Sequence, residues 1–321
     1  MRHSNSPVPS IRPITAGFYV PIVTPFSKET EGLDYPALRQ HVTWLAKCSV
    51  AGIVTQGSNG EAVHLSHTER QIVTSTAREA LNSAGFDDLP IIVGCGAQST
   101  LETIELCSHA AQAGGDAALV LPPSYYRSLY NEASILEFFA DVADASPIPI
   151  LIYNYPGVTS GFDMDSDAII SLSKHPNIIG CKLTCGNTGK LNRIVAATSA
   201  SSKPAFLCMG GSADFTTQAL VGGGSGIIGG LGNIAPRACV KVFDLYKAGK
   251  IDEAVKMQGV VARGDWVAIK TGIVGTKAAM ESYLGYGGYC RKPVPRPTKE
   301  EVERYVEGFA ELFELEKTLG L

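Results

Sequence analysis

Residues 175–190 have the sequence HPNIIGCKLTCGNTGK. Compact, largely apolar residues from Ile178 to Cys181 lie between a proline and a glycine-containing turn, a pattern typical of a short buried strand. Lys182 follows at the carboxyl end of that strand. Burial disfavours the charged form of an amine, and a neutral amine attacks a ketone to form a Schiff base. The ordinary alternative is a lysine that ends the strand and extends into solvent.

The same alternation of a short apolar run and a helical segment recurs from Gly17 onward. Apolar runs predict strands at residues 17–26, 52–57, 89–96, 116–123, 147–156, 177–182, 204–211 and 224–230. Helical periodicity follows the earlier runs, with Asp34 and Ser99 as candidate N-caps. Strands that are apolar on both faces suit a parallel sheet covered by helices. The pattern therefore predicts an α/β fold, a (β/α)₈ TIM barrel, whose active sites lie at the carboxyl ends of the strands.

Composition and pattern divide the chain into three predicted segments. Residues 1–14 are polar and rich in proline, without the apolar core of a secretory signal, so we expect a flexible N-terminal tail. Residues 15–234 contain the predicted barrel. Residues 235–321 show helical patterns and no strand pattern, which indicates a C-terminal helical extension packed on the barrel.

Charge and cysteine usage limit the partners that we expect. The net charge of −4 and the pI of about 5.9 lack the basic character of a nucleic-acid-binding protein. No apolar run is long enough to cross a bilayer. The 8 cysteines show no CxxC pair and no metal-ligand spacing. We therefore expect reduced thiols, no metal, no nucleic-acid or membrane partner, and a cytoplasmic location.

One motif points to a nucleotide cofactor and is set aside. Gly224, Gly226 and Gly229 satisfy the spacing GxGxxG, but that motif must follow a strand and open a helix. Here a helical segment precedes the glycines, which lie on both sides of a predicted strand. Close backbone approach within a tight barrel strand is the better interpretation.

Polar residues follow several of the predicted strands and should meet at one end of the barrel. GSNGE at residues 57–61 combines turn-forming glycines with Ser58 and Asn59, which suits an anion such as a carboxylate. PPSYYR follows at residues 122–127, and the fifth strand ends in Tyr153-Asn154-Tyr155-Pro156. A carboxylate turn, tyrosines for proton transfer and Lys182 together indicate a keto-acid site.

These segments also resemble a known family. GSNGE, PPSYYR, YNYPG and the GCK strand occur in the same order in the pyruvate-dependent class I aldolases of the dihydrodipicolinate synthase and N-acetylneuraminate lyase family, over about residues 17–284. GSNGEAVHL and KLTCGNTGKL are most similar to the fungal L-threo-3-deoxy-hexulosonate (2-keto-3-deoxy-L-galactonate) aldolases, and GSNGE is also similar to the 4-hydroxy-2-oxoglutarate aldolases. The resemblance implies a carbon–carbon lyase without cofactor or metal, acting on a small keto acid as a homotetramer (a dimer of dimers).

The resemblance also implies roles for individual residues. Lys182 matches the Schiff-base lysine, and Tyr153 matches the tyrosine that transfers protons and orients the keto acid. Ser58 and Asn59 match the pair that holds the pyruvate carboxylate within the turn that begins at Gly57. Ser58 also matches the hydroxyl of a proton relay.

Two further roles depend on neighbouring subunits or on backbone. Tyr125 matches a relay tyrosine that family tetramers supply across a subunit interface, and Tyr126 is the alternative one residue later. Ile228 matches a position whose backbone carbonyl lies near the bound keto acid.

One departure bears on the substrate. Dihydrodipicolinate synthases carry an arginine shortly after the YN-x-P segment, whereas residues 157–160 here are Gly-Val-Thr-Ser. Without that partner for a second carboxylate, a neutral polyhydroxy tail fits better, near Thr184, Asn187, Ser212 and Asn233. We therefore expect cleavage of L-threo-3-deoxy-hexulosonate to pyruvate and L-glyceraldehyde. The alternatives are a 4-hydroxy-2-oxoglutarate aldolase, a dihydrodipicolinate synthase and, more remotely, a catalytically silent keto-acid-binding barrel.

Overall fold

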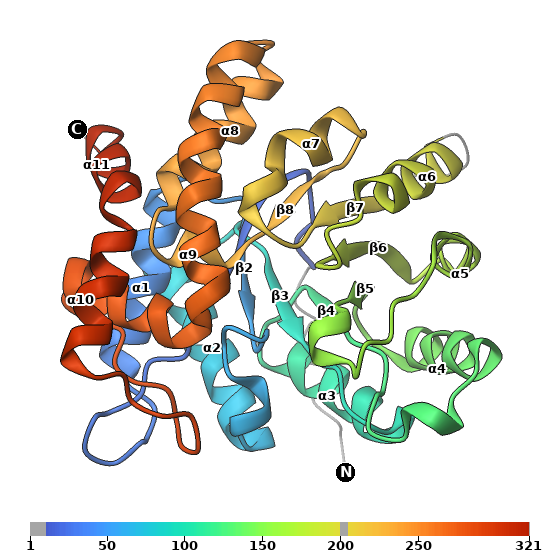
Figure 1. Ribbon diagram of the computed structural model, residues 1–321. Helices are drawn as coiled ribbons and strands as arrows, with labels where there is room; N and C mark the ends of the chain where they lie inside the picture. The colour runs from blue at the N-terminus through green and yellow to red at the C-terminus, as the bar shows by residue number, and fades with distance from the viewer. Residues whose placement is uncertain (1–10, 200–204, 321) are drawn as a thin grey trace.

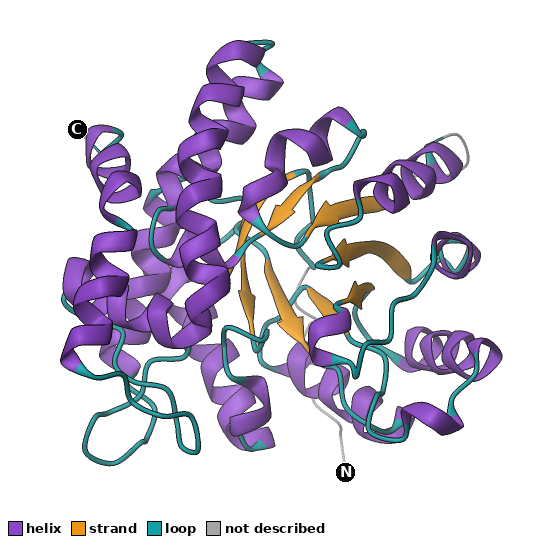
Figure 2. Cartoon of the chain, in the orientation of Figure 1, coloured by secondary structure: helices purple, strands orange, loops and turns teal. Residues whose placement is uncertain are grey.

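The computed structural model describes residues 11–199 and 205–320, so residues 1–10 of the expected tail lie outside the described part. Strands β1 to β8 form a closed parallel barrel in chain order, in which β1 also pairs with β8 (Figure 1). Figure 2 shows the strands inside a surrounding layer of helices. The structure confirms the predicted (β/α)₈ barrel with C-terminal helices.

The strands are short. Their bounds are β1 Gly17–Pro21, β2 Gly52–Thr55, β3 Ile91–Gly94, β4 Ala117–Val120, β5 Ile150–Asn154, β6 Ile178–Leu183, β7 Leu207–Gly210 and β8 Gly226–Ile228. The helices are α1 Tyr35–Lys47, α2 His67–Ser83, α3 Thr100–Gln112, α4 Glu132–Ala145, α5 Ser166–Leu172, α6 Thr188–Thr198, α7 Thr216–Val221, α8 Pro236–Lys247, α9 Ile251–Leu284, α10 Lys299–Gly308 and α11 Ala310–Thr318. None of these described helices has both the length and the apolar character to span a membrane.

Most of the predicted strands extend past the carboxyl ends of the observed strands, and beyond β1 a side chain takes up a backbone group. The first strand ends at Pro21 instead of residue 26, since the Val23 N–H donates to the side chain of Asn233 at 3.0 Å. A short 3₁₀ turn, η4 (Ala213–Phe215), leads from β7 into α7.

Apolar side chains fill the barrel interior and also the space between the strands and the surrounding helices. The interior cluster includes Tyr19, Leu151, Tyr153 and Met209, and a larger cluster fills the space between the strands and the helices. At Gly226 the strands approach closely: φ is +142°, and a Cβ there would lie 2.0 Å from the carbonyl oxygen of Gly17. The expected close backbone approach is confirmed, and a side chain at this position would force β1 and β8 apart.

The C-terminal helices divide differently from the sequence expectation. Helix α8 follows β8 and packs against α7 and β1, so it occupies the place of the eighth barrel helix, and the extension consists of α9, α10 and α11. Figure 1 shows α10 and α11 beside α9 at the same side of the barrel as α1. Helix α9 is kinked at Gly272, where φ is 59° and ψ is −153°. At the other terminus, Arg12 pairs with Asp116 at 3.2 Å, which holds this part of the expected tail against the barrel.

Candidate active site

A cavity of about 160 Å³ lies where the strands end. Six residues selected from the sequence line it: Ser58, Asn59, Tyr153, Lys182, Thr184 and Ser212. They come from β5, β6 and the segments that follow β2, β6 and β7. The far wall is supplied by the extension, because Asp265 and Ile269 of α9 line the same cavity. The closed barrel therefore brings these predicted residues into one space.

Lys182 lies near the end of β6 and is 4% exposed. In the register of the parallel pair it stands beside Tyr153 of β5, and its Nζ lies 4.2 Å from the centre of the Tyr153 ring. Across residues 11–199 and 205–320, no carboxylate lies within ion-pair distance of this Nζ, and no hydrogen bond to it is found. The contact that Lys182 Nζ makes is therefore a cation–π contact with the face of the Tyr153 ring.

The other buried lysines of the described chain have acidic partners. Lys190 of α6 contacts Asp163 and donates to the Met164 carbonyl at 2.6 Å. Lys277 of α9 pairs with Glu61 at 2.5 Å and donates to the Tyr289 carbonyl at 3.0 Å. Each of these two amines is occupied by a carboxylate and a backbone carbonyl. Lys182 is therefore the buried amine that is free to meet a substrate.

The Gly57–Glu61 turn presents Ser58 and Asn59 to the cavity. Backbone bonds close it, from Gly60 N–H to Gly57 O at 3.0 Å and from Glu61 N–H to Ser58 O at 3.2 Å. Glu61 has φ of +53°, a left-handed conformation that costs energy for a residue with a side chain. The turn therefore depends on contacts that hold Glu61 in place.

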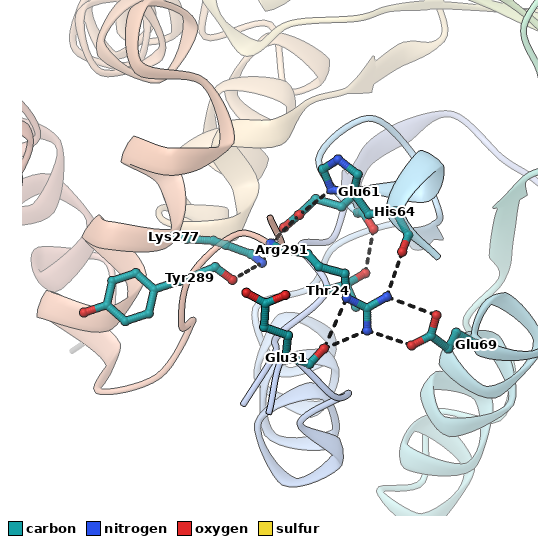
Figure 3. A network of polar contacts seen from close by, with 9 residues as sticks. Thr24, Glu31, Glu61, His64, Glu69, Lys277, Tyr289 and Arg291 are labelled. Carbon is teal, nitrogen blue, oxygen red and sulfur yellow. Dashed lines mark hydrogen bonds and ion pairs between the residues drawn. The ribbon is translucent and has the colours of Figure 1, made fainter. Parts of the chain in front are cut away.

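Those contacts come from the C-terminal segment, as Figure 3 shows. The buried Glu61 carboxylate accepts from Lys277 Nζ at 2.5 Å and from the Arg291 backbone N–H at 2.9 Å, and it lies 2.9 Å from Nδ1 of His64. The Arg291 guanidinium forms a fork with Glu69 of α2 at 2.7 and 3.0 Å, and this hydrogen bonding lowers the pKa of Glu69 to about 2. Residues more than 200 positions away thus fix the turn. The sequence did not reveal these long-range contacts.

Asp265 of α9 is the other site residue that sequence reasoning missed. It is 3% exposed and accepts from Ser212 Oγ at 2.5 Å and from the Asp214 N–H at 2.9 Å. Burial raises its pKa to about 6, against the opposing effect of the Ser212 hydrogen bond. No local signal marked this residue, because the sequence analysis sought site residues after the strands, and Asp265 lies within a helix.

The raised pKa of Asp265 predicts a pH-dependent stability difference. Above pH 6 the native state must ionise a buried carboxyl that ionises near 4 when unfolded, whereas below pH 4 it is protonated in both states. Stability of the wild type relative to Asp265→Asn should therefore fall by about 2 kcal/mol between pH 4 and pH 7. Urea unfolding of both proteins across this range measures the difference, and a difference that is constant with pH would contradict it.

Some expected site residues lie outside the cavity. Tyr125 is 78% exposed, and the neighbouring Tyr126 is also exposed. Asn187 caps α6 by accepting from the Lys190 N–H at 2.8 Å. The side chain of Ile228 is buried in the barrel interior. In this single chain, therefore, none of these side chains lines the space beside Lys182.

Two more expected residues have other positions. Gly57 lines a second cavity of about 400 Å³ that shares Ser58 and Tyr153 with the first. Asn233 does not serve as a free polar group for a substrate tail. Its side-chain amide donates to Pro21 O at 2.9 Å and to Gly230 O at 2.8 Å, and its oxygen accepts from Val23 N–H. The side-chain amide of Asn233 therefore uses its hydrogen bonds to hold backbone groups of the fold.

A cluster of possible metal ligands lies elsewhere. One atom each of His67, Glu105 and His109, on α2 and α3, lie within 4.8 Å of one another. A metal-bound histidine normally donates its second ring nitrogen to an acceptor, whereas Nδ1 of His109 is buried without a partner among the described residues. The cluster is separate from the residues that line the Lys182 cavity.

The fold and the site define a (β/α)₈-barrel enzyme whose cavity presents an unpaired amine at the end of the sixth strand. The chain belongs to the dihydrodipicolinate synthetase family, whose model matches residues 15–310. This confirms the resemblance seen in the sequence. The enzymes of this family named aldolases are carbon–carbon lyases.

Fungal relatives are similar over nearly the whole chain. The "Probable 4-hydroxy-2-oxoglutarate aldolase, mitochondrial" of Emericella nidulans is 56% identical over 96% of this chain and 98% of its own length. The L-threo-3-deoxy-hexylosonate aldolase of Hypocrea jecorina is 51% identical over 95% of this chain and 98% of its own. The crystal structure of a dihydrodipicolinate synthase family protein from Coccidioides immitis is similar with a TM-score of 0.85 at 33% identity, covering 95% of this chain and 98% of that one.

Proposed function

We propose that this protein is a pyruvate-dependent class I aldolase that reversibly cleaves a 2-keto-3-deoxy sugar acid to pyruvate and an aldehyde. The observation that carries the proposal is the buried Lys182, unpaired in the described chain and facing the cavity beside Tyr153. The substrate that we favour is L-threo-3-deoxy-hexulosonate, with L-glyceraldehyde as the second product.

The reaction proceeds through an imine on Lys182. The neutral amine attacks the C2 ketone, and loss of water gives a protonated imine. As the C4 hydroxyl loses its proton to Tyr153, the C3–C4 bond breaks, its electron pair enters the iminium system, and the aldehyde leaves. The remaining enamine is protonated at C3, and hydrolysis of the imine releases pyruvate and restores the amine. The iminium acts as the electron sink, so no metal ion is needed.

The other residues bind the substrate and move protons. Ser58 and Asn59 bind the pyruvate carboxylate at the Gly57–Glu61 turn, where both residues line the cavity beside Lys182. The proton from Tyr153 passes through Ser58 to Tyr125 and then to water. Tyr125 is exposed in the single chain, and we propose that a neighbouring subunit of a homotetramer brings its Tyr125 to this relay.

The lack of a second cation among the described lining residues of the cavity favours the sugar acid over a diacid. Lys182 is the one lysine or arginine among its described lining residues, so a second carboxylate would have no cationic partner there. The name of the Emericella nidulans relative supports 4-hydroxy-2-oxoglutarate as the second candidate substrate. Comparing initial rates with the two substrates, and with aspartate semialdehyde plus pyruvate for the synthase reaction, discriminates among the three activities.

Borohydride trapping tests the covalent step. Incubation with pyruvate followed by borohydride is expected to add one reduced pyruvyl group to the peptide that contains Lys182, detected by peptide mass analysis. The matched control omits pyruvate. An adduct on another lysine, or none, would contradict the proposed mechanism.

The assembly and location are proposals of their own. We propose a homotetramer in solution, which light scattering coupled to size exclusion measures directly. We propose a cytoplasmic location, although one relative carries the name mitochondrial. A fluorescent fusion at the C-terminus distinguishes the two compartments.

A further inference from the structure

We propose that Asp265 determines specificity at the far end of the cavity by accepting hydrogen bonds from the hydroxyl groups of a neutral tail and repelling a second carboxylate. This inference rests on the proposed function, since it concerns the part of the substrate that leaves as the aldehyde. It gives α9, which lies outside the barrel repeats, a direct role in substrate choice.

Position is the first argument. The Asp265 carboxylate lines the same cavity as Lys182 but comes from α9, whereas Lys182 comes from β6. Within the described residues, no lysine, arginine or histidine lies within ion-pair distance of Asp265. The donors that it meets are neutral: the Ser212 hydroxyl at 2.5 Å and the Asp214 N–H at 2.9 Å. Its negative charge is therefore available to the cavity.

A purely structural role is the competing explanation, because the same two bonds hold α9 against the η4 turn. Gln258, two helical turns earlier on α9, already makes this kind of contact. Its side chain donates to Ala213 O at 2.9 Å and accepts from the Thr217 N–H at 2.9 Å, and it does not line the cavity. A neutral amide is thus sufficient for docking. Burying a carboxylate is costly, so docking alone does not explain an acid at the cavity wall.

The chemistry of the wall suits a polyol. A carboxylate accepts hydrogen bonds from hydroxyl groups, and at pH 7.5 Asp265 is mostly ionised even though burial raises its pKa to about 6. Thr184 lines the same cavity, and its Oγ1 is buried without a hydrogen-bond partner among the described residues. A substrate hydroxyl could satisfy it. A dicarboxylate would instead place like charges together in a poorly solvated space.

The test is the ratio of kcat/KM for L-threo-3-deoxy-hexulosonate to that for 4-hydroxy-2-oxoglutarate at pH 7.5. The variants are Asp265→Asn and Asp265→Ser, which remove the charge, and the matched control is Gln258→Leu, which removes docking bonds away from the cavity. We expect the wild type to prefer the sugar acid and both Asp265 variants to shift the ratio toward the diacid by about 10-fold or more. The Gln258 variant should change the ratio by less than about 2-fold.

Borohydride trapping with pyruvate alone accompanies each assay. Normal pyruvate adducts in the Asp265 variants with an unchanged ratio would overturn the specificity role. So would an equal shift in Gln258→Leu, because docking would then explain the effect. A wild type that forms no adduct would instead overturn the proposed aldolase function, so the two failures are distinguishable.

Discussion

Lys182→Ala is expected to abolish pyruvate adduct formation and to lower kcat for the aldol cleavage by more than about 10⁴-fold. The reason is that the variant loses the covalent electron sink, for which the described cavity lining offers no other amine. Tyr153→Phe removes a proton-transfer group and should cost about 10²–10⁴-fold, the usual contribution of general acid–base catalysis. Steady-state rates and intact-protein masses after borohydride treatment measure both effects.

Peptide mapping provides the control within the same molecule. Lys190 and Lys277 are also buried, but their acidic partners should keep them unmodified in the wild type and in both variants. Equal residual activities of Lys182→Ala and Tyr153→Phe would contradict the assigned roles. Inhibition of the wild type by EDTA would contradict the metal-free mechanism.

Lys277→Met should destabilise the protein by about 3–5 kcal/mol, because it leaves the Glu61 carboxylate buried without its ammonium partner. Burial lowers the pKa of Lys277 and the attraction of Glu61 opposes that effect, which is the expected balance for a buried pair. Since Glu61 ends the turn that carries Ser58 and Asn59, the half-saturating pyruvate concentration for trapping should also rise. Urea unfolding and a trapping titration measure the two effects.

The double variant Glu61→Gln with Lys277→Met is the matched control. It removes both charges, so it should be more stable than Lys277→Met alone, with a coupling energy that a double-mutant cycle gives directly. The neutral amide that replaces the carboxylate could still accept from the Arg291 N–H, which lies 2.9 Å from Glu61 in the wild type. Strictly additive effects of the two substitutions would show that the pair does not hold the turn.

Most of the barrel could be predicted because its signals are local. Short apolar runs mark each strand, and parallel topology places the residues after the strands at one end. That topology predicted that Ser58, Tyr153 and Lys182 would meet, and the structure places all three around one cavity. The assignment of Asn233 to a substrate tail was wrong, because residue type does not reveal that the amide is already occupied by backbone groups of β1 and its neighbours.

The sequence by itself determined the barrel, the family and the lysine at the end of the sixth strand, since each depends on the order of residues within a short segment. Only the tertiary structure decided which buried lysine is unpaired and what surrounds it. The bond from Lys277 to Glu61 spans 216 positions, and that from Ser212 to Asp265 spans 53. Pairings at such separations leave no periodic signal, because they arise when the closed barrel and the kinked α9 bring distant side chains into contact.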